Sequence, residues 1–136
     1  MSDDPIHVPA PEMTALSRPF WDALKQGTLT FQRCAACGHA WLPARSECPQ
    51  CLGDEWQREA SKGAATLVSW VVYHQPYHPA FTQRLPYTVA AVQLDEGPRM
   101  ISNVVAADAA RLRIDQRLRL VIQDEGGLAV PHFAPA

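Results

Sequence analysis

Residues 34–51, CAACGHAWLPARSECPQC, decide the fold of the N-terminal half because they contain all four cysteines of the chain. The cysteines form two pairs with two residues inside each pair, and ten residues separate the pairs. Two residues between thiolates allow a tight turn to point both sulfurs at one ion. Two such turns that face each other complete a tetrahedron. We therefore interpret Cys34, Cys37, Cys48 and Cys51 as the ligands of one structural metal ion.

Zinc is the metal expected at this site. Closed coordination by four sulfurs leaves no position for water or substrate, so the ion stabilises a segment too small to fold by burial alone. Iron is the alternative, because soft tetrahedral sites accept both metals and the sequence does not fix which one loads. Cysteines without metal are the less favoured interpretation. His39, beside Cys37, is interpreted as a neighbour of the site and not as a ligand.

Composition limits the chain to one core with a small appended module. It has 136 residues, of which 47% are apolar and 19% are charged. The net charge is -2, so the chain lacks the excess of basic residues that drives binding to phosphate backbones. Nucleic acid is therefore disfavoured as a partner. The chain shows neither a basic start before an apolar run nor an apolar stretch of about eighteen residues. These features predict a soluble, cytoplasmic protein without membrane association.

The pattern of apolar residues predicts three parts. Residues 1–16 are proline-rich and read as a flexible N-terminal arm. Residues 17–60 read as a short helix that ends at Gly27, followed by the cysteine ribbon. Residues 61–136 read as a separate β-rich unit, with the boundary near 61–63. Ribbon strands are predicted at Thr28–Arg33, Ala40–Pro43 and Glu55–Ala60.

Five strands are predicted in the C-terminal unit, because runs rich in Val, Leu, Ile and aromatic residues alternate with turn signals. They cover Ala65–His74, Tyr87–Leu94, Arg99–Val105, Leu118–Ile122 and Leu128–Phe133. Residues 95–98 and 124–127 read as hairpin turns, and Asp108–Arg111 as a single helical turn. A mainly β fold with a five-stranded Greek-key barrel of the oligonucleotide/oligosaccharide-binding (OB) type suits this pattern. A small open sandwich is the alternative.

The loop between the first two of these strands, residues 73–87, is too long for a tight hairpin and carries four aromatic side chains. Such a loop folds back on the barrel, acts as a lid or docks on another molecule. His74 and His78 are interpreted as surface or packed imidazoles, since no nucleophile or carboxylate lies at a recognisable spacing. No catalytic residue is predicted. The basic run 111–119 is interpreted as a solvated strand edge in preference to a phosphate contact.

Several motifs together resemble one known family. They are the helix start PFW at 19–21, the paired cysteines, HPAF at 78–81, LDEGPR at 94–99 and the final PHFAPA at 131–136. From about residue 17 to 136 the chain resembles the acyl-CoA-associated OB-fold family, long called domain of unknown function thirty-five. Two departures stand out, because relatives commonly carry glycine where this chain has Leu52 and Asp115.

The resemblance implies a rubredoxin-like zinc ribbon joined to an OB-fold barrel. It also implies a partner, a thiolase-like or lipid-transfer-type enzyme of acyl-CoA metabolism, with steroid side-chain degradation among the family's settings. The leading hypothesis is a non-catalytic accessory subunit that docks on such an enzyme and helps bind acyl-CoA; the residues that would contact CoA are not identified. The alternatives are a single-stranded nucleic-acid-binding module and an iron-loaded electron-transfer ribbon.

Overall fold

The N-terminal segment leads into a single α-helix. The computed structural model describes residues 9–136, so half of the predicted flexible arm lies outside the described residues and its flexibility stays a prediction. Helix α1 (Arg18–Lys25) follows, with Pro19 in its first turn, where the missing N–H costs nothing. Gly27 ends it with φ +89°, a conformation that glycine adopts without strain. The predicted short helix is confirmed.

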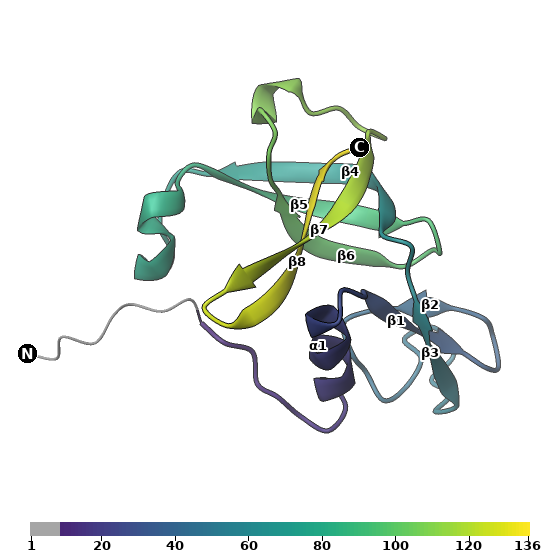
Figure 1. Ribbon diagram of the computed structural model, residues 1–136. Helices are drawn as coiled ribbons and strands as arrows, with labels where there is room; N and C mark the ends of the chain where they lie inside the picture. Colours follow the sequence, from purple (N-terminus) through teal and green to yellow (C-terminus); the bar gives the residue numbers. More distant parts are fainter. Residues whose placement is uncertain (1–8) are drawn as a thin grey trace, which may run out of the picture.

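The ribbon is a small antiparallel sheet of three strands, β1 (Thr30–Cys34), β2 (Ala40–Trp41) and β3 (Trp56–Ala60). Their order is β2-β1-β3, so the central strand β1 pairs with both neighbours. Figure 1 shows this sheet and α1 together on one side of the larger barrel. The two cysteine turns lie on the loops at the ends of these strands.

The rest of the chain forms a closed barrel with the strand order β4-β5-β6-β8-β7. All neighbours are antiparallel except β6 and β8, which run parallel, and a short 3₁₀ helix, η2, connects β6 to β7. Closure confirms the predicted five-stranded OB-fold barrel and excludes the open sandwich. The elements are β4 (Ala64–Tyr73), β5 (Tyr87–Leu94), β6 (Arg99–Val104), η2 (Ala109–Arg111), β7 (Arg117–Glu125) and β8 (Leu128–Pro135).

Ribbon and barrel share one hydrophobic core. Buried apolar side chains from α1, β1 and the loop after β2 form a continuous cluster with those from all five barrel strands. Among them are Leu24, Leu29, Phe31, Leu42, Leu67, Val92, Leu94, Leu118 and Phe133. Because the cluster is continuous, disorder in the ribbon would expose apolar surface of the barrel.

The LDEGPR turn fixes the segment that joins ribbon and barrel. Glu96 in this turn accepts hydrogen bonds from Ser61 Oγ and from the backbone N–H of Lys62, both at 2.8 Å. Arg33 of β1 donates to the Glu96 carbonyl oxygen at 3.3 Å. The turn therefore contacts both units at the predicted boundary; β3 ends at Ala60 and β4 begins at Ala64.

One element was not predicted, and one sequence interpretation needs correction. The loop 73–87 contains an unpredicted 3₁₀ helix, η1 (Pro79–Arg84), whose first turn is capped by His78 Nδ1. Strand β7, interpreted as an edge, pairs with β4 on one side and β8 on the other. Within the basic run, Arg117 forms two hydrogen bonds to the Asp95 carboxylate, at 2.8 and 2.7 Å. Within residues 9–136, no helix is long and apolar enough to cross a membrane.

Candidate metal centre and barrel pocket

The four cysteine sulfurs converge, as the spacing predicts. All four Sγ atoms lie within 4.8 Å of one another. Across the two turns, Sγ–Sγ distances are 3.5 Å from Cys34 to Cys51 and 3.6 Å from Cys37 to Cys48. A tetrahedral ion with metal–sulfur bonds of about 2.3 Å separates its ligands by roughly 3.8 Å. The donor set and its dimensions therefore fit a tetrahedral thiophilic ion.

Backbone N–H groups stabilise negative charge on the first sulfur of each pair. The N–H of Cys37 donates to Cys34 Sγ at 3.4 Å, and that of Ala36 at 3.3 Å. The bond from Cys37 is the largest cause that lowers the pKa of the Cys34 thiol, against the opposing effect of burial. At Cys48, burial opposes the shift, but the N–H groups of Cys51 and Gln50 lower the pKa. At Cys34 and Cys48 the turns thus favour the thiolate, the form that binds metal.

One side chain of β1 and one of β3 hold the loop between the two turns in place. Gln32 on β1 is almost fully buried, and its amide both donates to and accepts from the Arg45 backbone, at 2.8 and 3.0 Å. Trp56 donates from its indole N–H to the carbonyl of Ser46 at 3.1 Å. The loop between the cysteine pairs is therefore tied to β1 and to β3. His39 does not join the sulfurs; its ring stacks on Trp41, with the centroids 6.3 Å apart.

Leu52 stands at a backbone position that favours glycine, as the family pattern indicates. Its φ is +65°, and its side chain is 73% exposed. Because a Cβ in this region costs about 1–2 kcal/mol and little burial is lost, we expect Leu52→Gly to stabilise the protein by roughly 0.5–1 kcal/mol. Leu52→Ala keeps the Cβ and should give no gain. Urea unfolding of both variants checks this, and equal stability of the two would contradict it.

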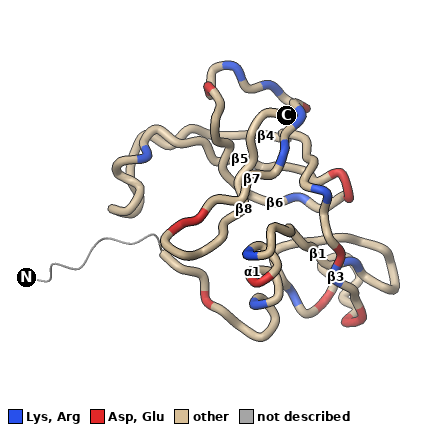
Figure 2. Tube along the Cα trace, viewed as in Figure 1, with Lys and Arg blue, Asp and Glu red and all other residues tan. Residues whose placement is uncertain are grey.

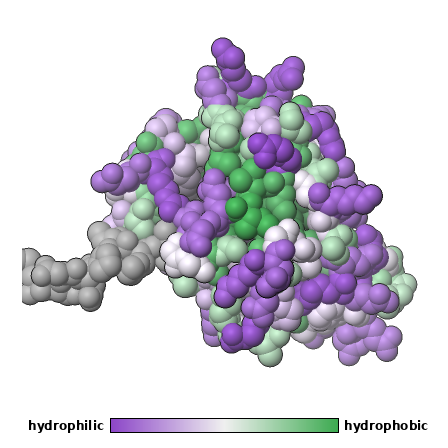
Figure 3. Space-filling view, viewed as in Figure 1, coloured by the Kyte–Doolittle hydropathy of each residue, from purple (hydrophilic) through white to green (hydrophobic). Residues whose placement is uncertain are grey.

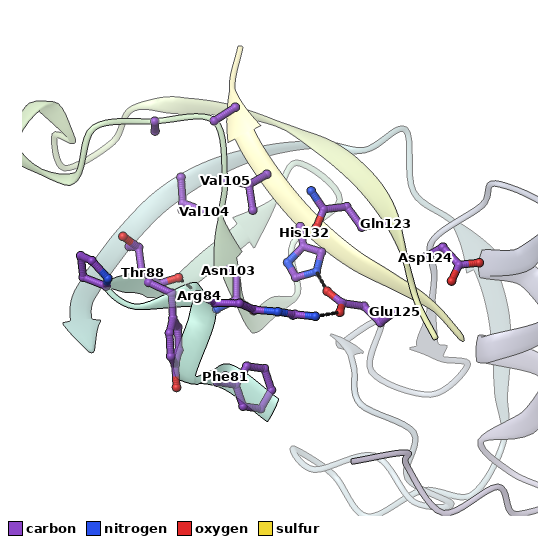
Figure 4. Close-up of a pocket in the computed structure, with 14 residues that line it drawn as sticks. Phe81, Arg84, Thr88, Asn103, Val104, Val105, Gln123, Asp124, Glu125 and His132 are labelled. Carbon is purple, nitrogen blue, oxygen red and sulfur yellow. Dashed lines mark hydrogen bonds and ion pairs between the residues drawn. The ribbon is translucent and has the colours of Figure 1, made fainter. Parts of the chain in front are cut away.

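A second site lies at the open end of the barrel. Residues from η1, β5, β6, β7 and β8 line a pocket of about 460 Å³ (Figure 4). Inside it, Glu125 at the end of β7 accepts hydrogen bonds from Arg84 and from His132 Nε2, the latter at 3.2 Å. His132 is 5% exposed, and no described residue gives its Nδ1 a hydrogen-bond partner. No motif in the sequence predicted this cluster.

Burial and pairing set the charges of this cluster. Burial raises the pKa of Glu125, but the hydrogen bonds from Arg84 and His132 outweigh it and lower the pKa overall. For His132, burial is the largest cause and lowers its pKa, although Glu125 acts in the opposite direction. At neutral pH the pocket therefore holds a carboxylate, a guanidinium and a neutral imidazole.

The lowered pKa of His132 predicts that the stability of the protein depends on pH. A histidine whose pKa is lower in the folded state contributes stability above about pH 6.5, its unfolded value, and this stability is lost as the pH falls. We therefore expect the melting temperature to fall as the pH drops below about 6.5, and His132→Gln to weaken that fall. His74→Gln, at an exposed position, is the control. Thermal unfolding followed by circular dichroism checks this; identical pH profiles for wild type and His132→Gln would refute it.

An apolar groove lies where α1 meets the barrel. Phe20 and Trp21 of α1, Met100 and Ile101 of β6 and Val130 of β8 line a hollow of about 410 Å³. Figure 3 shows an apolar area in the middle of this face of the molecule, over the barrel strands. Ile101 is 70% exposed. Exposed apolar surface of this kind, rimmed by polar residues, is typical of interaction sites.

The aromatic loop folds onto itself beside the pocket. Tyr73, Tyr77, Phe81 and Tyr87 make successive ring contacts, with centroids 5.2–5.7 Å apart. Phe81 and Tyr87 reach the pocket wall. His74 is exposed, and neither it nor His78 lines the pocket. Figure 2 shows acidic and basic residues interspersed over both units. The disfavoured nucleic-acid partner and the absence of catalytic residues stay predictions.

Fold and site together define a zinc-ribbon OB-fold protein. Residues 21–57 match the family model described as ChsH2, rubredoxin-like zinc ribbon domain. Residues 57–123 match the model described as ChsH2, C-terminal OB-fold domain. A DUF35 domain-containing scaffold protein of Methanothermobacter thermautotrophicus is 30% identical over 84% of this chain and 88% of its own length. The chain belongs to this ChsH2 (DUF35) family.

Longer relatives contain the same unit. A probable enoyl-CoA hydratase alpha subunit of Thermomonospora curvata is 37% identical over 86% of this chain. The 3-oxo-4,17-pregnadiene-20-carboxyl-CoA hydratase alpha subunit of Mycobacterium tuberculosis is 32% identical over 89%. The chain spans 37% and 38% of the lengths of these two proteins.

Solved structures agree with the fold. A chain of the Ltp2-ChsH2(DUF35) aldolase superposes with a TM-score of 0.80 at 33% identity, covering 93% of this chain and 98% of that one. A DUF35-family protein of unknown function from Sulfolobus solfataricus has a TM-score of 0.63 at 16% identity, covering 87% and 83%. The second likeness concerns the fold alone.

Proposed function

We propose that this protein is a non-catalytic accessory subunit that docks on a thiolase-like condensing, acyl-transferring or aldolase enzyme and helps bind its acyl-CoA. The observation that carries the proposal is the exposed apolar groove between α1 and β6, on a chain whose family includes proteins named as scaffolds and as part of an aldolase. Two relatives are named as alpha subunits of CoA-ester hydratases, which supports a role within an enzyme assembly.

The groove has the character of a docking surface. Ile101 projects from the barrel, while Phe20 and Trp21 pack edge to face, with centroids 5.1 Å apart, on the adjoining helix. Rigid aromatic groups beside an exposed aliphatic side chain give contact area at low entropic cost, as at the centres of protein interfaces. Because α1 and β6 share a core, their relative position is fixed before a partner binds.

The metal centre has a structural role in this proposal. Cys34, Cys37, Cys48 and Cys51 hold one zinc ion, and four thiolates leave it no position for a substrate. The ion fixes the two loops that flank β1, and β1 in turn supplies Phe31 to the shared core. Zinc therefore supports the surface that α1 presents.

Affinity purification of the tagged protein from its own host, with mass spectrometry and metal analysis of the same fraction, tests the proposal. We expect a thiolase-like protein to co-elute and about one zinc per chain. The matched variant Ile101→Asp places a charge in the groove and should lose the partner while it keeps the zinc. Ile114→Asp makes the same change at another exposed isoleucine, outside the groove, and serves as the control.

Other outcomes overturn the proposal. Turnover of an acyl-CoA by the isolated chain would contradict the non-catalytic role. Recovery of nucleic acid in place of an enzyme would favour the binding-module alternative. Iron with a visible absorption that bleaches on reduction would favour the electron-transfer alternative.

A further inference from the structure

The pocket at the barrel end combines a small-molecule volume with a buried polar cluster that the docking function does not use. Its 460 Å³ lies within the range of about 300–1,000 Å³ typical of ligand sites. One wall is apolar, with Phe81, Tyr87 and Val104, and the other carries Glu125 and His132. Figure 4 shows these side chains arriving from separate elements around one space.

The hydrogen bond to Glu125 determines the tautomer of His132. A carboxylate only accepts, so the neutral imidazole must carry its proton on Nε2 and donate it over the 3.2 Å to Glu125 Oε1. Nδ1 then presents a lone pair. Within the described residues this atom is buried and has no partner, whereas buried acceptors are nearly always paired. In Figure 4 the second ring nitrogen lies on the side away from Glu125, toward the β5 and β6 residues of the pocket.

The surrounding charges restrict what could pair with Nδ1. A fully deprotonated anion has no proton to offer and would meet the carboxylate of Glu125. A cation would be repelled by the guanidinium of Arg84, which already forms an ion pair with Glu125. A neutral group with an O–H donor satisfies the lone pair without either conflict. The rings of Phe81 and Tyr87 on the opposite wall favour a flat body behind that hydroxyl.

We propose that this pocket is a binding site for a neutral, phenol-like ligand whose hydroxyl donates to His132 Nδ1 while its ring contacts Phe81 and Tyr87. Arg84 is the lining side chain that we expect to move when a ligand enters. It is carried by the η1 loop, its side chain is 42% exposed, and it stacks over Phe81 with 5.3 Å from its guanidinium carbon to the ring centroid. Because Nδ1 is buried, a ligand reaches it only when lining side chains such as Arg84 shift.

Titration of the zinc-loaded full chain with 4-methylphenol tests the site, with 4-methylanisole as the matched probe. The ether has the same ring but no hydroxyl proton. We expect the phenol to bind about tenfold more tightly, the factor that corresponds to one net hydrogen bond. Long-range proton–nitrogen spectra of the imidazoles should show the Nδ1 resonance of His132 shifting with the phenol and not with the ether.

His132→Phe keeps the ring shape and removes the acceptor, so it should bind both probes equally weakly. His74→Phe, in the exposed part of the loop, should bind like wild type. The nitrogen spectra need no substitution and therefore decide the matter even if His132→Phe fails to fold. Equal affinity of wild type for the two probes, no binding of the phenol, or an unmoved Nδ1 resonance would each overturn the proposal. The experiment uses neither CoA nor a partner enzyme, so its result is independent of the docking function.

Discussion

Cys48→Ser is expected to abolish metal binding and to unfold the ribbon. Cys48 is fully buried, and two backbone N–H groups, at 3.4 and 3.5 Å, point at its sulfur. In zinc-finger peptides the apparent binding free energy of a structural zinc is about 10–16 kcal/mol, comparable to the whole stability of a small domain. Because the ribbon shares its core with the barrel, we expect the barrel to melt at a lower temperature as well.

Metal analysis and thermal unfolding of the purified variant check this prediction. Zinc should fall from about one per chain to well below it, and the amide signals of the ribbon should collapse toward random-coil positions. Ser46→Ala, a substitution at an exposed neighbour, should leave both properties unchanged. Chelation of the wild type should reproduce the loss, and added zinc should reverse it. A variant that keeps its zinc and melts like wild type would show that the Cys48 sulfur is not a required ligand.

The sequence predicted the elements whose signals are local. The paired cysteines depend only on spacing, and the strands follow from runs of β-branched and aromatic residues between turns. The family pattern also marked two positions correctly as favouring glycine, since Leu52 and Asp115 both have positive φ, +65° and +66°. Such features need no knowledge of which strands meet in space.

The polar cluster of the pocket could not be predicted in the same way. Residues 124–127 read as a solvent-exposed hairpin turn, yet the Glu125 side chain is 6% exposed because Arg84, from a loop 41 residues away, closes over it. The strand β8 is buried at four successive positions, 131–134, so the alternation that normally separates inward from outward residues is missing there. The signal that the sequence offered for this cluster was the acidic Glu125 and His132, seven positions apart on either side of a predicted hairpin turn.

The second large effect is a loss of stability expected on substitution of Phe133, which lies where the barrel closes. Strands β6 and β8 run parallel and pair at one described position, Val104 with Phe133, next to a 2.8 Å bond from the Val105 N–H to the Phe133 carbonyl. So short a ladder contributes little by itself. The seam also has a buried hydrogen bond from Ser102 Oγ to the Pro131 carbonyl, at 2.9 Å, and the ring of Phe133, 0% exposed, lies in the core beside it.

We therefore expect Phe133→Ala to destabilise the protein by about 3–5 kcal/mol, the sum of lost burial and the cavity left behind. Urea unfolding measures it, and Ile101→Ala on the exposed face of β6 is the matched control, expected to stay within roughly 0.5 kcal/mol. Hydrogen exchange should show the largest loss of protection at Val105, because the seam opens first when its ring is removed. A loss at Phe133 no larger than that at Ile101 would mean that the β6–β8 seam is not held by this side chain.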